Sequence, residues 1–125
     1  MKQFDIIEDR QQIPERDSEH LIATIDDNDI NKSLICARST KQIVRLFSDS
    51  PFATDLWDRG YSWMYITAKT GAVIDGRKVD RETFFNTLNE WGKTDKKFVV
   101  VHHSILSEGI NVKGLEAVLF MRNMD

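Results

Sequence analysis

The chain has 125 residues, of which 41% are hydrophobic and 30% charged, with 6 glycines and 2 prolines. This composition excludes collagenous, low-complexity and disordered chains, and the length fits one domain with a core of its own. No apolar run reaches the roughly 18–20 residues that a membrane span needs, and the first ten residues do not resemble a signal peptide. The net charge of −3 does not indicate a protein that binds nucleic acid tightly by bulk charge alone.

In the first half of the chain, apolar spacing predicts a strand and two helices after a polar beginning. Residues 1–17 are expected to be a lead-in with one short strand. Ser18 is a candidate cap for a helix with apolar residues at helical spacing. A short, almost wholly apolar run is typical of a strand buried on both faces. The expected elements are a strand at Phe4–Ile7, a helix at Glu19–Asp27, a strand at Ser33–Ala37, a helix begun by Ser39 or Thr40, and a helical turn at Asp55–Arg59.

The second half of the chain repeats the alternation of strand and helix. Aromatic and β-branched residues mark the next strand, and Asp80 is a candidate cap for an amphipathic helix that Gly92 would end. Two further apolar runs follow, separated by a polar loop. The expected elements are strands at Tyr61–Thr67 and Ala72–Ile74, a helix at Arg81–Trp91, a strand at Phe98–His102, a loop at Ser104–Gly114 and a strand at Ala117–Met121.

Strands separated by helical segments predict an α/β fold with three layers: an open, mostly parallel sheet with helices on both faces. In such sheets, ligands bind in the loops that leave the carboxyl ends of the strands. Two loops stand out: Arg38–Lys41 after one strand, and residues 102–111 after another. The second contains Ser107, Glu108, Gly109 and Asn111, and Gly109 permits a close backbone approach to a ligand. Taken alone, the same pattern also fits an ordinary polar loop.

The segment FVVVHHSILSEGINVKGLEAVLFM, residues 98–121, resembles motif V in the second RecA-like domain of superfamily-two helicases. SLICARST, residues 33–40, resembles motif IV, and the order of elements between the two segments agrees with that family. The resemblance covers residues 31–125 and is most specific at Ser107–Gly114. It implies a RecA-like helicase C-terminal domain at 31–125, preceded by an N-terminal lead-in and helix at 1–30.

The resemblance implies a lobe that closes over ATP and Mg²⁺, both held mainly by a first RecA-like lobe absent from this chain. It implies single- or double-stranded nucleic acid as a partner, with DNA favoured over RNA. It also implies a location in the cytoplasm of a bacterial or phage-infected cell. By the same resemblance, Gly109 and Glu108 would couple the nucleotide cleft to the strand, and Asn111 would lie near the ATP ribose. The residues implied in nucleic-acid binding are Arg38, Ser39, His103 and Ser107.

The chain also departs from the family pattern. It has no GxxxxGK[ST] phosphate loop, no DExH or DEAD sequence for magnesium, and no motif VI with its arginine finger. We therefore expect a fragment of a larger motor that neither hydrolyses ATP nor unwinds nucleic acid alone. The alternatives are a non-catalytic α/β protein-interaction module derived from a helicase domain, and a small flavodoxin-like nucleotide-binding protein.

Several residues have structural alternatives to a functional role. His102 and His103 are adjacent on a strand, so their side chains point to opposite faces and do not easily share a metal. Cys36 and Trp91 are expected in the core, whereas Trp57 is a candidate contact for a nucleic-acid base. Two small basic clusters fit either a solvated face or a phosphate track: Lys93, Lys96 and Lys97, and Arg77, Lys78 and Arg81.

Overall fold

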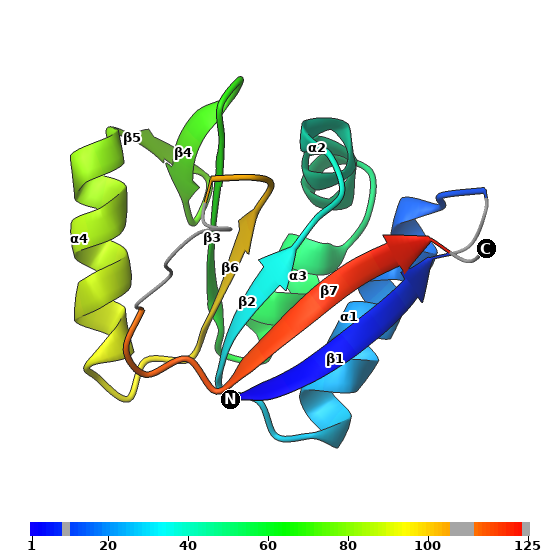
Figure 1. Cartoon of the computed structure of the whole chain (residues 1–125), viewed down its shortest axis with the longest axis horizontal. Coiled ribbons are helices and arrows are strands. Elements are labelled where there is room, and N and C mark those ends of the chain that lie inside the picture. The colour runs from blue at the N-terminus through cyan, green and yellow to red at the C-terminus, as the bar shows by residue number, and fades with distance from the viewer. Residues whose placement is uncertain (9–10, 106–111, 124–125) are drawn as a thin grey trace.

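The computed structural model describes residues 1–8, 11–105 and 112–123. These residues form one seven-stranded sheet with helices on both faces (Figure 1). The strands are β1 (Lys2–Glu8), β2 (Lys32–Cys36), β3 (Ser62–Thr67), β4 (Gly71–Ile74), β5 (Arg77–Val79), β6 (Phe98–His102) and β7 (Ala117–Asn123). The helices are α1 (Pro14–Asp27), α2 (Thr40–Ser48), α3 (Phe52–Asp58) and α4 (Arg81–Gly92).

The strand order across the sheet is β1-β7-β2-β6-β3-β4-β5. Neighbours from β1 to β3 are parallel, and β4 and β5 extend the sheet beyond β3 as antiparallel strands. The expected open, mostly parallel sheet is therefore confirmed. β5 was not predicted, because its three residues carry two charges and no apolar alternation.

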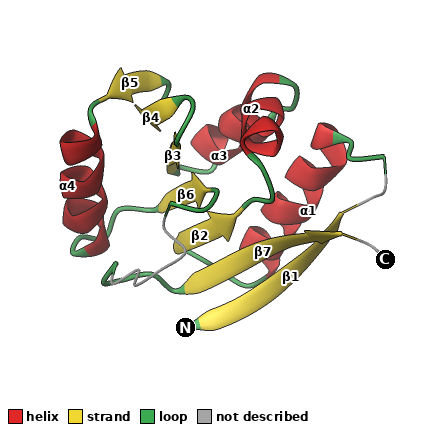
Figure 2. Ribbon diagram, turned by 45° about the horizontal axis from the view of Figure 1, so that its top comes forward, coloured by secondary structure: helices red, strands yellow, loops and turns green. Residues whose placement is uncertain are grey.

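The helices divide between the two faces of the sheet, as Figure 2 shows. α1, α2 and α3 pack together on one face, and α4 covers β3, β4 and β6 on the other. The connections from β1 to β2 to β3 cross the first face, whereas those from β3 to β6 to β7 return over the second. The chain moves across the sheet in one direction over the first face and in the opposite direction over the second. All these crossovers therefore have the same handedness, as expected for parallel strands.

Helix capping agrees with the sequence at two helices and differs at the first. Ser39 Oγ accepts a hydrogen bond from the Gln42 backbone N–H at 3.0 Å, and Asp80 Oδ1 accepts one from Thr83 at 2.7 Å. The prediction that Ser18 caps a helix beginning at Glu19 is wrong. α1 begins one turn earlier, at Pro14, a residue suited to the first helical position, and Ser18 is buried inside it.

The end of α4 lies against the β6–β7 crossover at two glycines. Gly92 is the last residue of α4 rather than the cap, which is Lys93. An added Cβ at Gly92 would overlap the carbonyl oxygen of Lys113, and one at Gly114 would overlap that of Gly92. Gly114 also has φ +94°. The two backbones therefore approach more closely than any side chain permits.

In the described part of the chain, no helix has the length and apolarity that crossing a membrane requires.

Candidate functional site

The two predicted loops leave adjacent parallel strands at the same edge of the sheet. Cys36, the last residue of β2, pairs with His102, the last residue of β6, and the Ala37 N–H donates to the His102 carbonyl at 2.9 Å. The Arg38–Ser39 turn and the His103–Ser104 turn therefore begin side by side. We call this edge, where the carboxyl ends of β1, β2 and β6 lie, the rim. Ser107, Glu108, Gly109 and Asn111 lie outside the described residues.

Arg38 is held at the rim by an ion pair with the end of β1. Its Nη1 lies 3.0 Å from Oε2 of Glu8, whose side chain is completely buried, while 34% of the Arg38 side chain is exposed. The other Glu8 oxygen, Oε1, is buried and has no hydrogen-bond partner among the described residues. A guanidinium has five N–H donors, so this ion pair leaves donors of Arg38 for a further anion.

A hydrogen-bond network continues from Arg38 into the first turn of α2. The Arg38 backbone N–H donates to Gln42 Oε1 at 2.8 Å, and the Gln42 backbone N–H donates to Ser39 Oγ. The Gln42 side chain also hydrogen-bonds Asp17 of α1. Ser39 is thus already engaged as a helix cap, and the network fixes the direction in which the turn leaves β2.

Asp17 is a buried acid behind this network. Burial, followed by the negative charge of Glu8, raises the pKa of the Asp17 carboxyl from 3.8 to about 6. The hydrogen bond from Gln42 and the charges of Arg45 and Arg38 oppose that shift. Asp17 is therefore ionised at pH 7 but takes up a proton in mildly acidic solution.

Two basic side chains of α2 lie next to the same hydrogen-bond network. Lys41 and Arg45 of α2 line a small cavity of about 30 Å³ together with Asp17, Ser39 and Gln42. A space of this size holds about one water molecule. A ligand larger than a water molecule therefore does not fit inside this cavity.

On the other side of β2, Cys36 and His102 line a cavity of about 400 Å³ on the face that α4 only partly covers. Cys36 Sγ lies 3.3 Å from His102 Nε2. Burial raises the pKa of the Cys36 thiol to about 11, and burial with the charge of His103 lowers the pKa of His102 to about 4. Both groups are neutral at pH 7, so the pair lacks the thiolate that nucleophilic catalysis requires.

The remaining predicted residues divide between the rim and the core. His103 is half-buried, and its Nε2 lies 3.3 Å from Ser104 Oγ. Trp91 packs against the α4-side core, as expected, and Cys36 is partly buried there. In the ranges that the structure describes, no three His, Cys, Asp or Glu side chains are placed to hold a metal ion.

Sequence reasoning missed Glu8, Asp17 and Gln42. Glu8 and Arg38 are 30 residues apart, and they meet because β1 and β2 run parallel in the same sheet and end at the same rim. The only local signal was an acidic residue directly after the apolar Ile6 and Ile7. The predicted cap at Ser18 leaves Asp17 in the lead-in, outside the helix.

A comparison of the sequence with protein-family models finds no match, and a comparison with curated protein sequences finds none either.

Proposed function

We propose that this chain is the second RecA-like lobe of an ATP-dependent superfamily-two helicase or translocase. In this role it closes over a nucleotide held by a first lobe and contacts the nucleic-acid backbone. The observation that carries the proposal is the shared rim: the segments that resemble motifs IV and V contain β2 and β6, whose last residues, Cys36 and His102, pair in register. Strand ends on opposite edges of the sheet would have excluded a common surface for the two motifs.

The charges at the rim support a contact with phosphate. Arg38 lies two residues before α2, a nine-residue helix, and Lys41 is in its first turn. Cationic side chains beside a helix amino end attract phosphate oxygens. Within the proposal, Arg38, Ser39, His103 and Ser107 contact the phosphate backbone of the nucleic acid. Glu108, Gly109 and Asn111 face the nucleotide.

The backbone contact is tested by fluorescence anisotropy of a fluorescein-labelled dT20 strand between 25 and 200 mM salt. Removing Arg38 alone would leave Glu8 buried and unpaired, so the comparison is between Glu8→Gln and the double variant Glu8→Gln/Arg38→Gln. We expect the double variant to bind several-fold more weakly and to lower the salt slope by about one charge.

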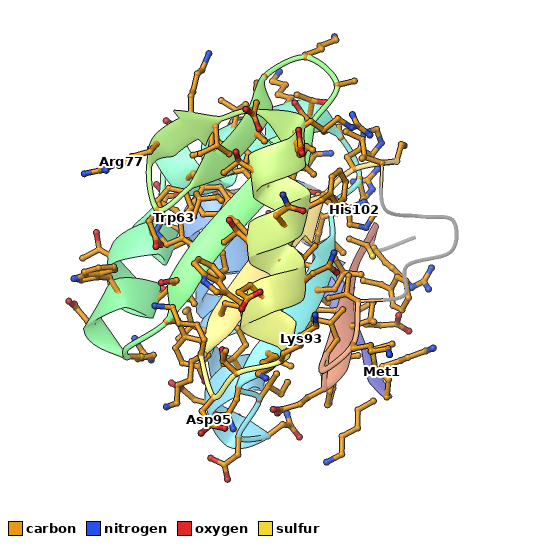
Figure 3. The ribbon with its side chains drawn as sticks, turned by 90° about the vertical axis from the view of Figure 1, so that its left-hand side faces the viewer. Met1, Trp63, Arg77, Lys93, Asp95 and His102 are labelled. Carbon is orange, nitrogen blue, oxygen red and sulfur yellow. The ribbon has the colours of Figure 1, made fainter. Side chains whose placement is uncertain are left out.

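Lys93→Gln is the matched control, because Lys93 follows α4 at the opposite end of the sheet from the rim (Figure 3). It removes the same charge and should leave both affinity and salt slope unchanged. Equal losses in the Arg38 and Lys93 variants would indicate diffuse attraction rather than a site at the rim.

The lobe assignment also predicts the absence of one activity. The sequence contains no Walker A loop, so the chain should hydrolyse no ATP above the buffer rate, with or without dT20. ATP turnover by the pure chain would contradict the assignment to a second lobe.

A further inference from the structure

A second candidate surface lies away from the rim, where β4 and β5 extend beyond the helices. Trp57 of α3, Trp63 of β3 and Arg77 of β5 line a cavity of about 650 Å³. An adjoining hollow of about 330 Å³ shares Trp63 and is lined by Phe47, Tyr65 and Lys78 among others. We call the two together the aromatic groove. Figure 3 shows Trp63 and Arg77 on one side of the molecule and His102 on the other.

The floor of the groove is a stack of three aromatic rings, Phe47, Trp63 and Tyr65. The Trp63 ring stacks on the Phe47 ring with centroids 4.7 Å apart, and the Tyr65 ring also stacks on the Phe47 ring, at 4.9 Å. The Trp63 and Tyr65 rings are parallel within 1°. Asp75 fixes the hairpin beside this floor, because its Oδ1 accepts a hydrogen bond from the Trp63 backbone N–H at 2.9 Å. The indole of Trp63 is therefore pre-oriented for a planar ligand.

Trp57 lines the groove and is largely exposed. It is 64% exposed, more than any other exposed aromatic side chain among the described residues. It belongs to α3, whose buried residues are Phe52 and Leu56. Core formation therefore accounts for those two side chains and leaves the indole of Trp57 unexplained.

The charge of the groove indicates the kind of ligand. Arg77 and Lys78 are both exposed on β5, and neither forms an ion pair with the described residues. The carboxylate at this site, Asp75, already accepts the hydrogen bond from Trp63. Two cations beside the exposed Trp57 ring and the partly buried Trp63 ring, in a chain of net charge −3, complement a ligand that combines flat rings with negative charge.

We propose that the aromatic groove binds unpaired bases of a single-stranded nucleic acid, with Trp57 and Trp63 stacking on bases and Arg77 and Lys78 contacting the flanking phosphates. Stacking on aromatic side chains is tolerant of sequence, because every base has a π face. The inference deepens the proposed function, since it assigns to the same strand a second contact made through bases instead of phosphates.

The test crosses one protein variant with one change in the ligand. Wild type and Trp57→Ala are titrated with dT12 and with a twelve-unit abasic strand that keeps the phosphates, and tryptophan fluorescence and anisotropy are both recorded. We expect dT12 to quench the fluorescence and the abasic strand not to. Trp57→Ala should weaken binding of dT12 about tenfold and leave binding of the abasic strand unchanged.

Two further variants complete the design. Trp57→Phe keeps an aromatic ring and should recover most of the affinity for dT12. Arg77→Gln removes a charge and should weaken binding of both strands by the same factor. Trp57→Ala binding dT12 as tightly as wild type, or losing affinity equally for both strands, would overturn the inference.

The experiments distinguish failure of the proposal for the aromatic groove from failure of the proposal for the rim. If the Glu8→Gln/Arg38→Gln variant loses affinity while Trp57→Ala does not, the proposed function stands and the groove is not a base site. If Trp57→Ala removes base-dependent binding while the Arg38 comparison shows no difference, the groove stands and the rim contact falls. If wild type binds neither strand, both proposals are overturned.

Discussion

Asp17 and His102 are 6% and 2% exposed, and burial moves their pKa values in opposite directions. In each case burial favours the neutral form: it raises the pKa of Asp17 from 3.8 to about 6 and lowers that of His102 from 6.5 to about 4. The folded state thus binds the Asp17 proton more tightly than the unfolded state, and the His102 proton less tightly. On acidification Asp17 adds stability between about pH 6 and 4, whereas His102 removes it between about pH 6.5 and 4.

The two shifts predict opposite pH profiles for two variants. Each contributes at most about 3 kcal/mol, so they largely cancel in the wild type. Asp17→Asn should be more stable than wild type at pH 7.5, and this advantage should disappear by pH 4. For His102→Gln the difference from wild type should move the other way, in favour of the variant as the pH falls. Urea unfolding at half-unit pH intervals measures both.

The double variant Asp17→Asn/His102→Gln serves as the control. The two residues lie on different elements, α1 and β6, so their pH-dependent differences should add. A profile for Asp17→Asn that stays parallel to wild type from pH 7.5 to 4 would contradict the burial of an ionisable carboxyl at this position.

For single residues, the sequence predicted the positions of Cys36 and Ser39 but not the burial of Asp17. Cys36 was placed in its strand by apolar pattern, and Ser39 was recognised as a cap by its type. The burial of Asp17 follows instead from α1 beginning at Pro14, which adds a turn and carries Asp17 against α2. The apolar spacing that predicted the helix begins only at Leu21, so it contained no signal for that turn.

At the scale of elements, the strands that were predicted best are those with continuous apolar runs. All five residues of β6 are buried, since the strand lies in the middle of the sheet with helices near both faces. β5 was missed because its residues are mostly exposed and it is held by pairing with β4 alone. Periodicity reports burial, so it detects central strands and overlooks short edge strands.

The contact between α4 and the crossover yields a prediction about Gly114. Gly114→Ala adds a methyl group where the Gly92 carbonyl oxygen lies, at φ +94°, so the crossover must move away from α4. We expect a loss of about 2–4 kcal/mol in the free energy of unfolding. Thermal and urea denaturation measure it.

Gly60→Ala is the matched control for Gly114→Ala. Gly60 has a similar positive φ of +84°, but an added Cβ there meets nothing within 4 Å. Its cost should be only that of placing an L-residue in the left-handed region, about 1 kcal/mol. Equal losses at Gly60 and Gly114 would show that the close approach to Gly92 does not matter for stability.

At the scale of the whole molecule, the order of strands could not be predicted from local pattern. The parallel sheet followed from the alternation of strands and helices, but nothing in that alternation indicates that β7 inserts between β1 and β2. This insertion places the last strand beside the first, with Lys2 paired to Ala117. It also brings Glu8 to the rim, where it meets Arg38. Of the rim residues that sequence analysis missed, Glu8 is the one that depends on this long-range pairing.

Some strand pairs of this sheet are close in sequence and others are far apart, and this difference predicts an order of folding. β3 and β4 pair through a short connection, as Thr67 does with Gly71, whereas β1 and β7 meet only after nearly the whole chain is in place. The entropy of closing a loop increases with its length, so distant pairs form after local ones. We therefore expect the region around β3 and β4 to be structured in the folding transition state and β1 to join the sheet afterwards.

Ile66 of β3 and Ile6 of β1 allow this order to be tested with one chemical change, because both are 1% exposed. Ile→Val at either position should cost about 1 kcal/mol, above the limit of roughly 0.6 kcal/mol for a reliable kinetic analysis. Stopped-flow folding in urea should show Ile66→Val acting mainly by slowing folding, and Ile6→Val mainly by speeding unfolding. The reverse assignment would mean that pairing of the two end strands nucleates the sheet, and that the local hairpin forms only on a framework already closed.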